Sequence, residues 1–139
     1  MASKQQLMGM RGVYLVASEL SRLGFIASPT SRSAIGADIL AADQSCQNTF
    51  SVQVKTNART FNFWLLTKKA KEQVSDIHIY VLVNLRHNKS GETIEYFIVP
   101  SRVISEKMVY SKSKNSEWYA INLKDVKKYH DNWSVFGKV

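Results

Sequence analysis

The sequence is poor in the residues that build covalently linked or metal-stabilised scaffolds. Cys46 is its one cysteine, and it has two prolines among 139 residues. A single thiol excludes an intramolecular disulfide framework and any zinc site made from several cysteines. The fold must therefore depend on burying apolar side chains, and 45% of the residues are hydrophobic. This composition indicates a globular protein rather than a disulfide-rich or disordered one.

Long apolar runs are also missing. No stretch approaches the roughly 18 residues that a transmembrane helix needs, and residues 1–6 lack a signal-peptide pattern. No helical pattern joins a strong apolar face to a basic face, as a membrane-surface helix would. We therefore expect a cytoplasmic protein without membrane contact. Its length favours one domain, residues 1–139.

Several catalytic and cofactor motifs are absent. The sequence has neither a Gly-x-x-x-x-Gly-Lys phosphate loop nor a Gly-x-Gly-x-x-Gly dinucleotide motif. Its histidines, His78, His87 and His130, are scattered and form no His-x-x-x-His pair. Nothing points to a Ser/His/Asp triad. These absences leave few enzyme classes to consider.

Acidic residues are in deficit. The chain has 11 acidic and 19 basic residues, which gives a net charge of +8 and a pI near 9.7. Such a chain gains affinity for a polyanion by releasing the counterions around it. Charge alone thus favours a nucleic-acid partner, although many small basic proteins bind nothing specific.

The most informative stretch runs from residue 36 to residue 56. Two short segments rich in apolar and β-branched residues, 36–42 and 50–56, flank a polar break at 43–49. This pattern is typical of two strands joined by a hairpin loop. The hairpin is the element around which we expect the rest of the chain to be organised.

Alternation along this hairpin gathers polar groups on one face. Gln53 and Lys55 share a face of the second strand because side chains alternate, and Val52 and Val54 take the other. If the loop centres on residues 45 and 46, Asp38 falls opposite Gln53. A carboxylate, an amide and an ammonium crowded together are costly unless they bind something.

The order Gly-x-Asp, a loop, then apolar-Gln-apolar-Lys resembles the PD-(D/E)XK nuclease superfamily. It is most similar to the Mrr-like and Holliday-junction-resolvase-like variant that ends in Gln-x-Lys. The resemblance implies an α/β fold with a restriction-endonuclease-like core. In that core a central mixed β-sheet of about four to five strands is flanked by helices. It also implies DNA as the partner and Mg²⁺ as the cofactor, with Mn²⁺ as a substitute.

The resemblance further implies a role for each residue of the motif. Asp38 is the primary metal ligand, and the carbonyl of Val54 supplies another oxygen. Gln53 stands where Asp or Glu is commoner, so its amide oxygen can coordinate metal without adding charge. Lys55 orients or deprotonates water, or stabilises the negative charge that develops. Asp43 is a spare carboxylate at the loop.

Glu19 is the further candidate in the first part of the chain. Residues 4–23 predict a helix, because apolar side chains recur at helical spacing and Gly24 follows as a C-cap. Glu19 lies on the flank of the apolar stripe, where an ordinary surface glutamate is one interpretation. The resemblance implies the other, in which this helix gives a second catalytic carboxylate and metal ligand.

Basic residues beyond the motif are candidates for DNA contact. Basic and aromatic residues interleave in 56–64, a mixture that suits backbone contact and base stacking. The alternative is that Phe63 and Trp64 fold back onto the core. The side chains we expect to contact phosphate are Arg59, Lys68, Lys69 and Lys71. A solvated face is the alternative for the lysines.

The rest of the chain supplies the frame. Residues 25–28 predict a first strand, with a loop at 29–33. Residues 77–85 predict a central strand covered on both faces, and 93–99 the returning strand. A helix at 102–106 with Ser101 as N-cap, a mobile loop at 107–116, a strand at 118–123 and a helical stretch at 125–129 follow. Trp133 and Phe136 should pack the tail onto the domain.

Three functions are compatible with these patterns. The first is a metal-dependent DNA endonuclease that hydrolyses phosphodiester bonds, of resolvase, restriction or homing type. Such a small nuclease would need to form a homodimer to cut both strands. The second is a catalytically weakened nuclease-fold module that holds nucleic acid or a protein partner, and the uncharged Gln53 keeps it open. The third is a structural basic subunit in which Asp38 and Lys55 form an ion pair, although such pairs gain little over apolar packing.

Overall fold

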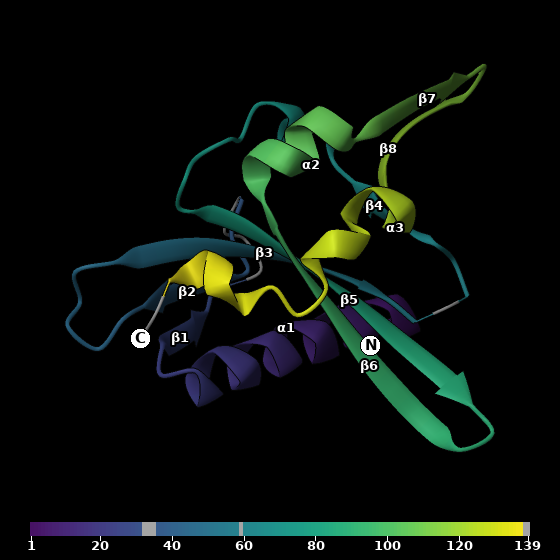
Figure 1. Cartoon of the computed structure of the whole chain (residues 1–139). Helices are drawn as coiled ribbons and strands as arrows, with labels where there is room; N and C mark the ends of the chain where they lie inside the picture. The colour runs from purple at the N-terminus through teal and green to yellow at the C-terminus, as the bar shows by residue number, and fades with distance from the viewer. Residues whose placement is uncertain (32–35, 59, 138–139) are drawn as a thin grey trace.

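A long helix and two β-sheets make up the chain (Figure 1). The computed structural model describes residues 1–31, 36–58 and 60–137. The main sheet has five strands in the order β1-β2-β3-β5-β6. Its strands pair antiparallel except β3 with β5, which are parallel, so the sheet is mixed as expected. Their bounds are Ile26–Pro29 (β1), Ile39–Ala42 (β2), Thr49–Asn57 (β3), His78–Asn88 (β5) and Gly91–Pro100 (β6).

Helix α1 (Lys4–Arg22) covers one face of this sheet. It begins with a capping box, in which the Ser3 hydroxyl accepts from the Gln6 backbone and the Gln6 amide oxygen accepts from the Ser3 backbone. Its buried residues are Gly12, Val16 and Leu20. The helix is thus held by its own first turn and by a narrow apolar stripe against the sheet.

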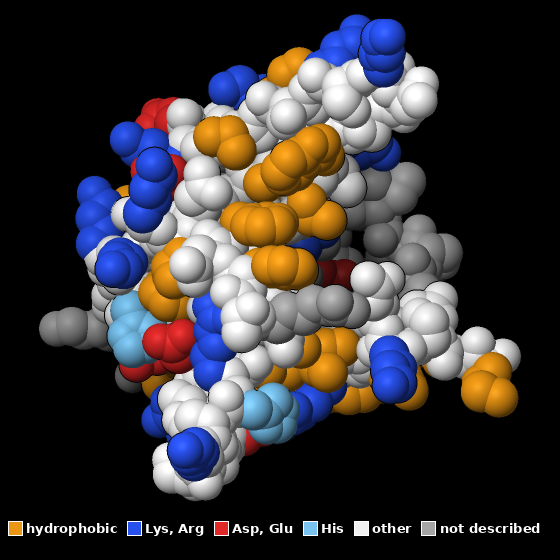
Figure 2. Space-filling model, turned by 90° about the vertical axis from the view of Figure 1, so that its right-hand side faces the viewer, with side chains coloured by type: hydrophobic (Ala, Val, Ile, Leu, Met, Phe, Trp, Pro, Cys, Tyr) orange, Lys and Arg blue, Asp and Glu red, His pale blue; other side chains and the backbone are white. Residues whose placement is uncertain are grey.

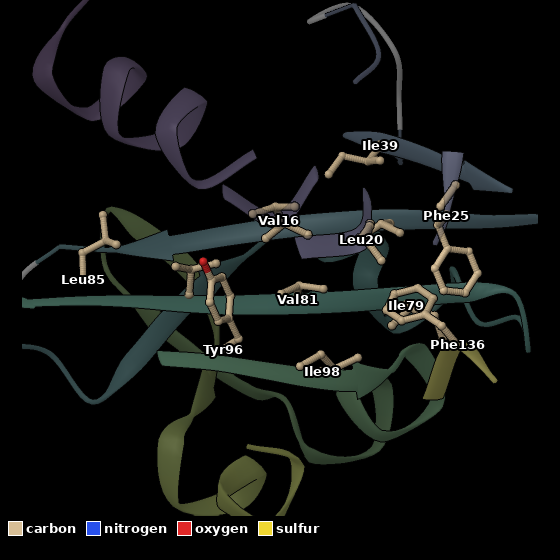
Figure 3. Packing of buried hydrophobic residues seen from close by; sticks show 14 residues of the cluster. Val16, Leu20, Phe25, Ile39, Ile79, Val81, Leu85, Tyr96, Ile98 and Phe136 are labelled. Atoms are coloured by element: carbon tan, nitrogen blue, oxygen red, sulfur yellow. The ribbon is translucent and has the colours of Figure 1, made fainter. Parts of the chain in front are cut away.

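The core lies on both faces of the main sheet. On the α1 side, Val16 and Leu20 pack with inward residues of the strands and with Phe136 from the tail (Figure 3). On the other side, residues such as Tyr80 and Leu82 pack under the second sheet. All residues of β5 from 78 to 85 are buried, which confirms the expected central strand. The packing of Trp133 and Phe136 confirms the expected docking of the tail.

The second sheet was not expected in full. It has three strands in the order β4-β8-β7: Phe63–Leu66 (β4), Ser116–Asn122 (β8) and Val109–Ser113 (β7). The prediction of a mobile loop at 107–116 is therefore wrong. Tyr110 lies opposite Tyr119 and donates a 2.7 Å hydrogen bond to Glu117, so polar cross-strand contacts hold a hairpin that hydrophobic patterning does not reveal.

Two smaller expectations also change. Pro29 belongs to β1, which is permitted because β1 is the edge strand of the main sheet. Ser101 is the first residue of helix α2 (Ser101–Lys107) rather than its cap, and its buried hydroxyl exchanges hydrogen bonds with the Ser75 backbone.

The remaining short helices are η1 (Lys68–Lys71), α3 (Leu123–Val126), η2 (Lys127–Tyr129) and η3 (Trp133–Phe136).

Membrane-spanning helices are not found: within the described ranges, no helix has both the length and the apolar character to cross a bilayer.

Gly12 lets α1 approach β3 closely. A Cβ at this position would lie 1.8 Å from the Thr56 hydroxyl oxygen and 3.0 Å from its Cβ. Rotation of Thr56 cannot remove the second contact, so the helix would have to shift. We expect Gly12→Ala to lower the free energy of unfolding by about 1–3 kcal/mol, measured by urea denaturation.

Gly9 supplies the matched control, because a Cβ there meets nothing within 4 Å. Gly9→Ala should raise the free energy of unfolding by about 0.5–1 kcal/mol, since alanine restricts the unfolded chain. Equal stability of Gly12→Ala and the unsubstituted protein would contradict the close approach described here.

Candidate active site

The β2–β3 hairpin has the register that the sequence suggested. Ile39 lies opposite Val52, which puts Asp38 opposite Gln53 just before β2 begins. The Asp38 backbone is held on both sides: its N–H donates to the Val52 carbonyl at 2.8 Å, and its carbonyl accepts from Thr30 N–H at 2.9 Å. The side chain of Asp38 is therefore displayed from a fixed main chain.

Two hydrogen bonds orient the Asp38 carboxylate. Its Oδ2 accepts from the Val54 backbone N–H at 2.8 Å and from the Gln53 side-chain amide at 3.1 Å. A strand residue directs its N–H and its carbonyl to the same neighbouring strand. The Val54 carbonyl thus faces the side where Asp38 lies, and the Gln53 side-chain amide reaches the same carboxylate through its Nε2.

Lys55 completes the group. Its half-buried side chain lies on the Gln53 face of β3 and lines the same hollow as Asp38. Burial lowers the pKa of its ammonium below the usual value, and the negative charge of Asp38 partly opposes that shift. The amine is consequently easier to deprotonate than a solvated lysine.

A hollow of about 500 Å³ opens over these residues. One wall is the N-terminal half of α1, and another is residues 29–31. The α1 residues that line it are Gln6, Gly9, Met10, Val13 and Tyr14. None of these carries a charge. Asp38 is therefore the one carboxylate among the described residues that line the hollow.

Tyr80 lies beside Gln53 in the next strand, a neighbour that sequence reasoning did not identify. Its pKa rises to about 12, first through burial and second through the negative charge of Asp38. The neighbour was missed because the parallel pairing of β3 with β5 joins residues far apart in the sequence.

Glu19 lies elsewhere. It binds Arg22 one turn along the helix, with 2.6 Å between Oε2 and Nε, and it is not among the residues lining the hollow. Five residues of helix separate it from Tyr14, the last α1 residue that lines the hollow, or roughly 7 Å along the axis. Glu19 therefore stands outside the group of residues that surrounds Asp38 in this hollow.

The other candidate side chains have separate positions. Lys68 and Lys69 are exposed on η1, and the Lys71 ammonium donates to the Ser105 carbonyl at 2.8 Å. Arg59 lies outside the described residues. Asp43 organises the β2–β3 loop, where a side-chain hydrogen bond from Asn48 lowers its pKa to about 2. No group of three His, Cys, Asp or Glu side chains in the described ranges is placed to hold a metal ion.

Comparison with known proteins supports this architecture. No protein-family model matches the sequence, and neither does any curated protein. Solved structures do match, and the likeness shows a restriction-endonuclease-like fold. One of them is Hjc, a Holliday junction resolvase from the archaeal hyperthermophile Archaeoglobus fulgidus. The match has a TM-score of 0.53 and 15% sequence identity, and it covers 83% of this chain and 91% of that chain.

The pKa of Lys55 provides a direct test of the site geometry. Asp38→Asn removes the charge that favours the ammonium, so the Lys55 pKa should fall further, as measured by NMR titration of the lysine side chains. The unfolded chain binds more protons at Lys55 than the folded chain. Its contribution to the free energy of unfolding should therefore grow as pH rises toward 10.5.

Asp43→Asn is the control for this titration, because Asp43 lies in the β2–β3 loop among its own partners. It should leave the Lys55 midpoint unchanged. An unchanged midpoint in Asp38→Asn would mean that the two charges do not interact.

Proposed function

We propose that this protein is a metal-dependent endonuclease that hydrolyses phosphodiester bonds in DNA. The observation that carries the proposal is the Asp38 carboxylate, fixed by Gln53 and Val54 beside a half-buried Lys55. These groups line one hollow in a fold shared with a resolvase. Neither a purely structural ion pair nor a simple basic surface requires such an oriented carboxylate.

The donor set fits a divalent cation of the Mg²⁺ or Mn²⁺ kind. Asp38 would bind it through a carboxylate oxygen, with the Gln53 amide oxygen and the Val54 carbonyl as neutral donors. Mg²⁺ keeps several waters and often relies on only one or two carboxylates plus the phosphates of the substrate. When bound, the metal would polarise the scissile phosphate and lower the pKa of an attacking water.

The protein's own groups would contribute to catalysis through the charge of Lys55 and through the fixed orientation of Asp38. In its ammonium form Lys55 stabilises the negative charge that develops on the phosphate oxygens, while its lowered pKa also lets the amine accept a proton from water. The hydrogen bonds to Asp38 fix the carboxylate before substrate arrives, so little reorganisation is needed.

DNA would be held mainly by charge. The net charge of +8 attracts the phosphate backbone. Arg59, Lys68, Lys69 and Lys71 remain the proposed phosphate contacts. A chain with one such site cuts one strand at a time, so we propose that two copies act together where both strands are cut. The resolvase with the same fold suggests branched DNA as the first substrate to test.

A second candidate is a module that binds DNA without cutting it. Two observations favour it: Asp38 is the one carboxylate of the described lining, and Glu19 binds Arg22 without lining the hollow. Fewer negative charges mean weaker metal binding. The two functions differ only in whether the bound DNA is cleaved.

Cleavage by variants tests the proposal. Branched, supercoiled and linear DNA are incubated with Mg²⁺ or Mn²⁺. Asp38→Asn should abolish cleavage while keeping DNA binding, because it removes the charged ligand and also some repulsion of phosphate. Lys55→Ala should lower the rate by about 100-fold or more while leaving metal binding intact.

Glu19→Gln is the matched control, since this variant removes a carboxylate that lies away from the hollow. It should cut at the rate of the unsubstituted protein. Undiminished cleavage by Asp38→Asn would show that this site is not the catalytic one. DNA binding without cleavage under any metal would support the binding module instead.

Gln53→Glu tests the deficit of charge. A second carboxylate beside Asp38 should tighten Mn²⁺ binding by at least about tenfold, measured by calorimetry without DNA. Asp43→Asn should leave Mn²⁺ binding unchanged, because Asp43 is bound within the β2–β3 loop. Unaltered binding in Gln53→Glu would remove Gln53 from the ligand set.

A further inference from the structure

The outer face of the second sheet is unusually apolar. Side chains alternate along β4, so Trp64 and Leu66 enter the core while Phe63 and Leu65 point outward. Phe61, Leu65 and Trp118 are 48%, 57% and 43% exposed. Figure 2 shows hydrophobic side chains gathered across the middle of this face of the molecule. Large exposed apolar patches of this kind usually mark sites where a protein binds a partner or ligand.

Three rings form the continuous part of this patch, which we name the aromatic ridge: Phe61, Phe63 and Trp118. The rings of Phe61 and Phe63 are stacked, with centroids 5.2 Å apart and planes inclined by 21°. Trp118 follows at 6.0 Å from Phe63 with a tilt of 50°. The ridge presents exposed aromatic surface on adjoining elements of the second sheet.

The aromatic ridge is attached to the strand that carries the candidate site. Asn57 lies on the same face of β3 as Lys55, two residues further on, or roughly 7 Å along the strand. Its side-chain amide donates to the Phe61 carbonyl at 2.6 Å. The Arg86 guanidinium donates to the same carbonyl at 2.9 Å. The ridge thus begins at the end of β3, the strand that carries the candidate site, and the Arg86 guanidinium lies at its base.

The size and charge of the ridge indicate which kind of ligand or partner binds it. Its rings, each of about 150–250 Å² and only half exposed at most, offer on the order of 300 Å². A stable homodimer needs about 800 Å² from each partner. The Arg86 guanidinium at the base of the ridge and the net charge of +8 favour an anionic ligand. A polyanion with flat apolar faces suits both features.

We infer that the aromatic ridge stacks against unpaired bases of a nucleic-acid strand that enters the candidate site. Bases in a continuous duplex stack on one another and have no face to offer, whereas the bases of a single strand do. The inference rests on the proposed nuclease function for its substrate class. It specifies that class as DNA with unpaired nucleotides beside the cut.

Binding measured without metal tests the ridge separately from cleavage. A fluorescent single-stranded oligonucleotide and the same sequence as duplex are titrated in the presence of a chelator. Phe61→Leu and Trp118→Leu keep apolar surface but remove the ring. Each should weaken single-strand binding by about tenfold, with duplex binding changed by less than about twofold.

Leu40→Ala is the matched control, because Leu40 is an apolar side chain of β2 with 55% exposure and no part in the ridge. It should bind both forms as the unsubstituted protein does. Circular dichroism melts confirm that the variants fold. Quenching of tryptophan emission by the single strand should also decrease in Trp118→Leu, because the quenched ring is removed.

Several results would overturn the inference. These are unchanged single-strand binding in both ridge variants, an equal loss for duplex, no binding of single strands by the unsubstituted protein, or a dimer in sedimentation that the variants dissociate. The last result would assign the ridge to self-association. A protein that never cuts but loses single-strand binding in the ridge variants would refute the nuclease and keep the ridge. If the protein cuts DNA and the ridge variants bind single strands as well as the unsubstituted protein does, the nuclease proposal stands and the ridge inference is refuted.

Discussion

The hydrogen bond from the Val54 backbone to Asp38 is the contact on which the site depends. It forms where β2 stops pairing with β3, so a carboxylate takes over the acceptor role that a strand carbonyl would otherwise have. A buried N–H without an acceptor is costly, which favours this arrangement from within the fold. The side-chain orientation that the proposed chemistry requires is thus also the one that completes the sheet.

Packing on both faces of the sheet determines where polar groups can lie. Helix α1 closes over β3 through Gly12 on one side, and the second sheet covers β5 on the other. Two asparagines are nevertheless buried among the apolar side chains, Asn57 at 7% exposure and Asn84 at 0%. At the far end of β3, Asn57 lies opposite Asn84, whose amide in turn reaches Glu95, so hydrogen bonds satisfy these buried polar groups. The core here is two apolar clusters, one on each face of the main sheet, with a few hydrogen-bonded polar side chains among them.

The sequence predicted what alternation and local pairing control. The register of Asp38 against Gln53 followed from loop length, and the buried β5 followed from its apolar run. Glu19 could not be placed, since helical spacing defines a stripe but not which half of the helix faces a distant hairpin. Tyr80 and the Tyr110–Glu117 hairpin were missed for a related reason. One depends on parallel pairing across a long connection, and the other on polar contacts that resemble a loop.

The start of α1 has a consequence for how the site opens. Gln6 both closes the capping box with Ser3 and lines the hollow. Helix ends open locally at low free-energy cost, far below that of global unfolding. The wall of the site therefore includes the turn that the capping box holds. Opening of that turn would widen the entrance while the opposite wall, on β3, stays fixed, so access to Asp38 depends on the capping box that Ser3 and Gln6 form.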